Sequence, residues 1–193
     1  MNRLSLSLLL IAAAIPLAAA PDSPALTLVG TYNTGLGANG AEIISVREKD
    51  NLGAITNIAG SVDLLDLSNP SSITLIRRVA VNPAYGTPNS VAIHPSQDYM
   101  LVASGVGSID GAVKGRITAY SIPDGTELTS ALAGVQPDSV AISHNGNYAV
   151  VANEAEGVES TPRNNGGEGS LSVIRLQDFN PKKPSALLVL QVP

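Results

Sequence analysis

The sequence predicts an all-β protein, a partial β-propeller of about three four-stranded blades. The main observation is an internal repeat: Pro-Asn-Ser-Val-Ala-Ile at 88–93 returns 49 residues later as Pro-Asp-Ser-Val-Ala-Ile at 137–142. In both copies a Tyr and then a Val-Ala pair follow at the same spacing, and a weaker copy begins at Ala41. A period of about 50 residues that carries several short strands is typical of one propeller blade per repeat.

Composition supports this fold class. Hydrophobic residues make up 44% of the 193 residues, but aromatic residues only 3%, and there is no Trp. The core must therefore be built from Val, Ile, Leu and Ala, which suits strands. The 18 Gly and 13 Pro supply the turns of an all-β chain. The formal net charge is -5 and Lys and Arg form no cluster, which argues against a nucleic-acid partner.

The first 20 residues differ from the rest of the chain. Arg3 precedes an apolar run over 4–15, Pro16 interrupts it, and three Ala follow at 18–20. This order is typical of a secretory signal peptide, so we expect an exported mature chain over 21–193. The alternative, a membrane anchor, would need about 20 apolar residues. Because the chain has no Cys, a disulfide-free protein of the periplasm or cell surface is favoured.

The repeat places the elements in order. Residues 26–32 match residues 73–79 at a spacing of 47 and are therefore expected to be a lone fourth strand ahead of the first blade. We expect the blades at about 41–79, 89–132 and 138–192. Their predicted strands are 42–46, 52–57, 61–67 and 73–79; then 90–94, 99–104, 116–122 and 127–132; then 139–143, 148–153, 170–176 and 187–192. Since a propeller ring needs at least about four blades, we expect a fragment of a larger closed propeller.

One loop face of the predicted propeller carries the candidate site. Loops between strands two and three, and between one blade and the next, open on the same face, and both long insertions belong to the first kind. Asp138 begins a first strand, and Glu154 and Glu156 follow a second strand of the same blade. Carboxylate oxygens so grouped are candidate ligands for Ca²⁺, which takes six to eight oxygens. The alternative is a solvated acidic loop without a metal.

Other motifs are interpreted as structural. Residues 35–40, Gly-Leu-Gly-Ala-Asn-Gly, spell a dinucleotide fingerprint, but a strand rather than the required helix is expected after them. An inter-blade turn is therefore the preferred interpretation. His94 and His144 are expected in turns at the face opposite the long loops, without a nucleophile beside them. No cluster of His and Asp supports a phosphatase metal site in this chain.

Several motifs in a fixed order resemble one family. They are Leu-Val-Gly-Thr-Tyr at 28–32, Ala-Glu-Ile at 41–43, the segment 61–70, Pro-Asn-Ser-Val-Ala at 88–92, Pro-Asp at 137–138 and the segment 150–156. Over about residues 26–175 the chain is similar to the choice-of-anchor I family. These are exported bacterial propellers related to the mesenchyme-specific cell-surface glycoproteins of animals, and some carry alkaline-phosphatase or phytase-like labels.

The resemblance implies export and a propeller. The expected function is an exported binding or scaffold module of the cell surface or periplasm, with no evident catalytic residues and an unknown partner on the long-loop face. The alternative is a part of a secreted metal-dependent phosphoesterase. A redox propeller of the quinoprotein kind would rest on fold analogy alone.

Overall fold

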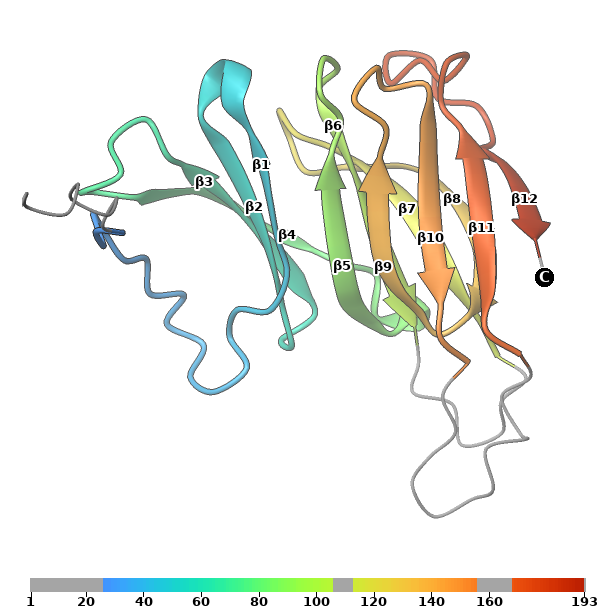
Figure 1. Ribbon diagram of the computed structural model, residues 1–193, viewed down its shortest axis with the longest axis horizontal. Coiled ribbons are helices and arrows are strands. Elements are labelled where there is room, and N and C mark those ends of the chain that lie inside the picture. Colours follow the sequence, from blue (N-terminus) through green and yellow to red (C-terminus); the bar gives the residue numbers. More distant parts are fainter. Residues whose placement is uncertain (1–25, 106–112, 156–167, 193) are drawn as a thin grey trace, which may run out of the picture.

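Three four-stranded antiparallel sheets lie side by side in chain order (Figure 1). The structure is a computed structural model, and it describes residues 26–105, 113–155 and 168–192. Blade 1 comprises β1 (Ile44–Arg47), β2 (Leu52–Asn57), β3 (Ser61–Asp66) and β4 (Thr74–Ala80). Blade 2 comprises β5 (Thr87–Ile93), β6 (Tyr99–Gly105), β7 (Lys114–Ser121) and β8 (Glu127–Val135). Blade 3 comprises β9 (Pro137–Ile142), β10 (Tyr148–Asn153), β11 (Ser170–Arg175) and β12 (Leu188–Val192).

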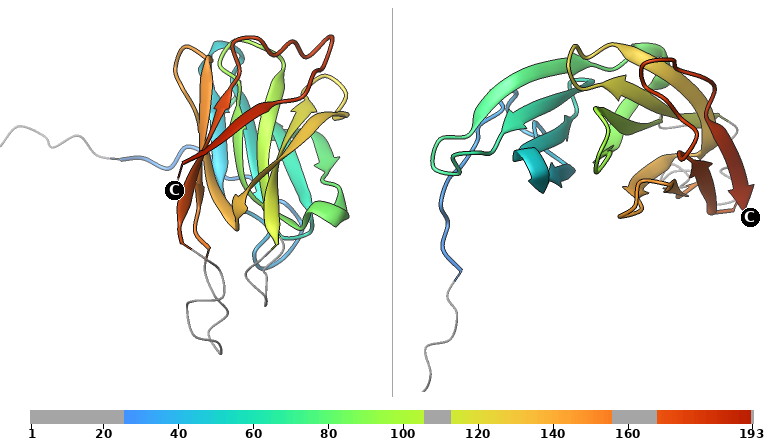
Figure 2. Two further views of the ribbon diagram at one scale, coloured as in Figure 1. Left: turned by 90° about the vertical axis from the view of Figure 1, so that its right-hand side faces the viewer. Right: turned by 90° about the horizontal axis from the view of Figure 1, so that it is seen from above.

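The blades are arranged as an arc, as expected of part of a propeller. Each strand pairs with the strand before and after it in the sequence, so every blade is an up-and-down sheet. Seen from above, β1, β5 and β9 line the concave side of the arc and β4, β8 and β12 its convex side (Figure 2). Short 3-10 helices over Glu48–Asp50 and Pro83–Tyr85 occupy connections. The predicted all-β fold of three four-stranded sheets is thus confirmed.

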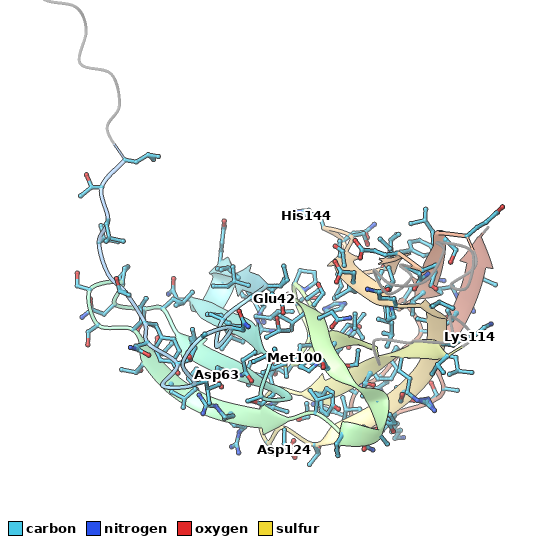
Figure 3. All side chains as sticks on the ribbon, turned by 90° about the horizontal axis from the view of Figure 1, so that it is seen from below. Glu42, Asp63, Met100, Lys114, Asp124 and His144 are labelled. Atoms are coloured by element: carbon cyan, nitrogen blue, oxygen red, sulfur yellow. The ribbon has the colours of Figure 1, made fainter. Side chains whose placement is uncertain are left out.

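Apolar layers between the blades form the core. Strands of blade 2 are buried on both faces, so alternate residues along a strand pack against blade 1 and against blade 3. Met100 and Val102 pack with Leu64 in the layer between blades 1 and 2, where Figure 3 marks Met100. Leu101 packs with Val151 in the layer between blades 2 and 3. All seven residues of β6 are buried, which makes the middle blade common to both layers.

Arg47 joins blade 1 to blade 2 by hydrogen bonds. It ends β1 and is 5% exposed. Its Nη1 donates to the carbonyl oxygens of His94 and Gln97 in blade 2, at 3.3 and 2.7 Å. Its Nε and Nη2 donate to the carboxylates of Asp50 and Asp98, at 2.9 and 3.2 Å. The buried guanidinium therefore satisfies two carbonyls and two carboxylates at one junction.

Serine hydroxyls connect the innermost strands. The Ser45 Oγ accepts a hydrogen bond from the backbone N–H of Ile93 at 3.0 Å, which joins β1 to β5. The Ser90 Oγ accepts one from the N–H of Val140 at 3.1 Å, which joins β5 to β9. Because strands of different blades share no backbone ladder, these bonds fix the register of one innermost strand against the next.

The prediction of a strand over Leu26–Tyr32 is wrong, because the structure assigns no strand to residues 26–34. The segment 26–34 forms no ladder with β4 or with any other described strand. It is held instead by side chains: the Tyr32 hydroxyl donates to the carboxylate of Asp63 at 3.1 Å, and the Arg78 Nη2 donates to the Thr34 carbonyl at 2.9 Å. Arg78 also binds both oxygens of the fully buried Asp63, at 2.6 and 2.8 Å.

We predict that Arg47→Ala lowers the free energy of unfolding by about 2–3 kcal/mol, because it leaves buried carbonyls of blade 2 without their charged donor. Urea unfolding followed by circular dichroism measures this change. The matched control is Arg175→Ala, which removes an ion pair to Asp178 whose side chains are 47% and 67% exposed. Such an exposed pair contributes about 1 kcal/mol or less. Equal effects of the two substitutions would contradict the role assigned to Arg47.

Candidate functional site

Two of the three predicted calcium ligands lie at the same end of blade 3. Asp138 is the second residue of β9 and is half-buried. Glu154 follows β10 directly, and its backbone N–H donates to the carbonyl of Gln136 at 3.0 Å, one peptide ahead of β9. The next N–H, that of Ala155, donates to the carbonyl of Val135 at 3.2 Å. Two backbone hydrogen bonds thus connect the segment that follows β10 to the segment that precedes β9. Glu156 lies outside the described residues.

The backbone around these carboxylates is closely packed. Asn153 ends β10, and its Oδ1 accepts the N–H of Gly134 at 3.0 Å. Its Nδ2 donates to the carbonyl of Ser170 and the hydroxyl of Ser172, at 3.2 and 3.0 Å. A Cβ added at Gly134 would lie 2.5 Å from the Asn153 side chain, so only glycine permits this approach. Asp138 and Glu154 are therefore carried by a rigid junction between blades.

Within the described residues, no group of three or more His, Cys, Asp or Glu side chains is placed to hold a metal ion. Two carboxylates supply fewer oxygens than the six to eight that Ca²⁺ takes. The ligand set of Asp138, Glu154 and Glu156 therefore stays a prediction.

A groove of about 580 Å³ follows the concave side of the arc. Its walls come from the innermost strands of all three blades, and its residues include Ile44 and Val46 of β1, Ala92 of β5 and Ala141 of β9. Lys49 and His144 lie at the end where the turns after these strands meet. Sequence analysis did not predict this groove. Ile44 and Val46 are 55% and 54% exposed, and this exposure of apolar residues in a first strand is not visible in the sequence.

His94 is a buried structural residue rather than a simple surface turn residue. It follows β5 and is 2% exposed. Its Nδ1 accepts hydrogen bonds from the backbone N–H groups of Ser96 and Gln97, at 3.2 and 2.9 Å. The proton of the neutral ring is therefore on Nε2, which donates to the carbonyl of Gly146 in blade 3 at 3.1 Å. Burial, with the nearby positive charge of Arg47, lowers the pKa of His94.

The remaining motifs have structural roles in this fold. Residues 35–40 form a turn in which Gly35 and Gly37 have φ of 72° and 75°, and β1 rather than a helix follows. The expected turn before a strand is thus present, whereas its position between two blades stays a prediction, because residues 26–34 form no strand. Asn39, which precedes β1, corresponds to Gln136, which precedes β9. Both residues have positive φ. The carbonyl of each accepts a hydrogen bond from the backbone N–H of the residue that follows the second strand of its blade. His144 lies exposed in the turn after β9 (Figure 3).

Arc, blade topology and repeat together define this protein as a β-propeller. The choice-of-anchor I domain matches residues 42–189, and the chain therefore belongs to the choice-of-anchor I family. No curated protein matches the sequence.

Solved structures share the fold at low sequence identity. Hydrazine synthase of Kuenenia stuttgartiensis is 15% identical with a TM-score of 0.52, over 79% of this chain and 37% of that one. The β-propeller domain of Cps50 (Swd1) from Myceliophteria thermophila is 11% identical with a TM-score of 0.52, over 81% of this chain and 38% of that one. This chain thus spans under two fifths of either structure, and the similarity concerns the fold alone.

We predict that His94 makes stability depend on pH. Because its pKa is lower in the folded than in the unfolded chain, its contribution is complete above about pH 6.5 and is lost as the pH falls through the folded pKa. Protonation of Nδ1 would also remove the acceptor for two backbone N–H groups. The free energy of unfolding, measured in urea from pH 7.5 to 5, should therefore decrease.

His94→Gln should flatten this dependence, whereas the exposed His144→Gln should preserve it. The same slope in wild type and His94→Gln would show that another group controls the pH dependence.

Proposed function

We propose that this protein is an exported propeller module that binds a ligand or partner at the cell surface or in the periplasm, without catalysing a reaction. The main support for this proposal is the concave groove, because residues from the innermost strands of all three blades form its continuous surface. Concave surfaces built from successive repeats are a common means of binding. The charge-then-apolar-then-Ala order of residues 1–20 supports export. Among the described residues, no helix has the length and apolarity needed to cross a membrane.

The alternative, part of a metal-dependent phosphoesterase, receives no support from the described residues. Such an enzyme needs several His, Asp or Glu ligands around one or two metal ions. The buried carboxylate of Asp63 is already bound by Arg78 and Tyr32, and His94 uses both ring nitrogens in backbone hydrogen bonds. These two groups are therefore committed to the fold rather than available to a substrate.

We propose in addition that Ca²⁺ binds outside the groove, to Asp138, Glu154 and Glu156 at the junction of blades 2 and 3. The Glu154–Gln136 backbone bond supports this assignment, because it holds the second carboxylate beside the strand that carries the first. Bound Ca²⁺ would add a further contact between the two segments and give this end of the propeller a positive charge for a partner.

We predict that the exported chain binds Ca²⁺ and that Asp138→Asn combined with Glu154→Gln weakens the affinity at least about tenfold. Exported modules commonly bind Ca²⁺ with dissociation constants of about 10⁻⁴–10⁻³ M, within reach of calorimetry. The matched control, Asp124→Asn with Asp178→Asn, removes two exposed carboxylates at the opposite end and should leave the affinity unchanged. The mass of the exported protein, measured by mass spectrometry, should correspond to a chain without residues 1–20.

Undiminished affinity in the Asp138/Glu154 variant would place the calcium site elsewhere, and no heat of binding would exclude Ca²⁺ as the ligand. An exported protein that retained Met1 would contradict the signal peptide.

A further inference from the structure

A second cavity lies between blades 2 and 3, at the upper end of these blades in Figure 1. It measures about 630 Å³ and shares no residue with the concave groove or with the candidate calcium site. One wall comes from the two turns of blade 2, through Gln97, Asp98 and Pro123. The opposite wall comes from the connection between β11 and β12, through Gln177 and Lys182. Both walls belong to neighbouring blades, so no further blade is needed to form this cavity.

Buried groups hold the blade 2 wall in place. The backbone N–H of Gln97 donates to the Nδ1 of His94 at 2.9 Å, and its carbonyl accepts from the Nη1 of Arg47 at 2.7 Å. The Nη2 of Arg47 also donates to the Oδ1 of Asp98, at 3.2 Å. The carbonyl of Asp98 accepts the N–H of Ile122 at 3.1 Å, which joins the two turns of the wall. The positions of Gln97 and Asp98 are therefore fixed by the same residues that join the blades.

Phe179, the only Phe of the chain, anchors the opposite wall. It is 5% exposed and packs edge to face on Tyr99 of blade 2, with the ring centroids 5.0 Å apart. The N–H groups of Leu176 and Gln177 donate to the carbonyl of Asn147 within blade 3, at 2.8 and 3.2 Å. The connection is thus bound to both blades. A cavity that is formed before the ligand arrives lowers the entropy cost of binding.

Most of the cavity lining can donate or accept hydrogen bonds. Amide, carboxylate or hydroxyl groups come from Gln97, Asp98, Ser121, Gln177, Asp178 and Asn180. Within the described part of the chain, the side-chain amides of Gln97 and Gln177 have no hydrogen-bond partner, so both are available to a ligand. Apolar rings of Pro123, Pro181 and Phe179 lie among these polar groups.

We propose that this cavity binds a saccharide. The hydroxyl groups of a sugar both donate and accept hydrogen bonds, and the amides and carboxylates of the lining match these two roles. The C–H groups of the sugar would pack on the proline and Phe rings. Among the described lining residues Lys182 is the one cation, whereas a phosphate ligand is typically held by several. This inference deepens the proposed binding function and rests on it only for the exported location.

Titration calorimetry with cellobiose, maltose and N,N′-diacetylchitobiose tests the proposal, with EDTA present so that calcium does not contribute. At least one of the three should bind. Gln97→Ala combined with Gln177→Ala removes one amide from each wall and should weaken that affinity at least about tenfold. Because neither amide has a partner in the described fold, the midpoint of urea unfolding should stay at the wild-type value.

Two neighbouring lysines give a matched control. Lys182→Ala removes a hydrogen-bond donor from the cavity and should weaken the affinity. Lys183→Ala removes the same charge from the same connection, but Lys183 does not line the cavity, so the affinity should be unchanged. Equal effects of the two substitutions would overturn the proposed site.

No binding of any of the three disaccharides would overturn the proposal, as would undiminished affinity in the Gln97/Gln177 variant. Binding of trilysine in place of the disaccharides would assign the cavity to a cationic peptide and overturn the saccharide. Export and calcium binding are measured by mass spectrometry and by calorimetry without EDTA. Failure of the saccharide site is therefore distinguishable from failure of the proposed function.

Discussion

The structure depends on the burial of the middle blade on both of its faces. A sheet with an apolar face must bury that face against another element of the structure. In β6, alternate residues enter different layers: Met100 and Val102 face blade 1, whereas Leu101 and Ala103 face blade 3. Each outer blade is therefore folded against a surface that blade 2 supplies. We therefore expect the arc to unfold as one cooperative unit rather than as three independent sheets.

Polar groups at the junctions determine how one blade meets the next. Apolar layers are not directional, whereas Arg47 and His94 each reach a specific carbonyl in the following blade. The hydroxyl oxygens of Ser45 and Ser90 each accept a hydrogen bond from a specific backbone N–H of the following blade. These contacts connect residues 47 to 52 positions apart, about one repeat, so the repeat itself supplies matching partners along the chain.

The repeat was sufficient to predict the fold and most strands. Period and alternation identify β2 and β10 at their observed bounds, because a strand buried in a blade has a strong local pattern. The segment 26–32 was wrongly predicted as a strand. Its residue pattern matches that of a strand, but a strand also needs hydrogen bonds to a neighbouring strand, and the residue pattern does not show those. The buried roles of Arg47, His94 and Asp63 were missed. Each depends on a partner from a distant segment, which residue type alone does not reveal. Asp138 and Glu154 were placed at one end correctly, since the blade topology determines which loops adjoin.

Hydrogen exchange of Leu101→Ala, followed by mass spectrometry, tests the cooperative arc most directly. Leu101 is fully buried between blades 2 and 3, and such a truncation costs about 2–5 kcal/mol. If the three blades unfold as one unit, protected amides in β2, β6 and β10 should all exchange faster by a similar factor, at least about thirtyfold. Faster exchange in β6 and β10 with unchanged protection in β2 would show that blade 1 folds independently and would contradict this account.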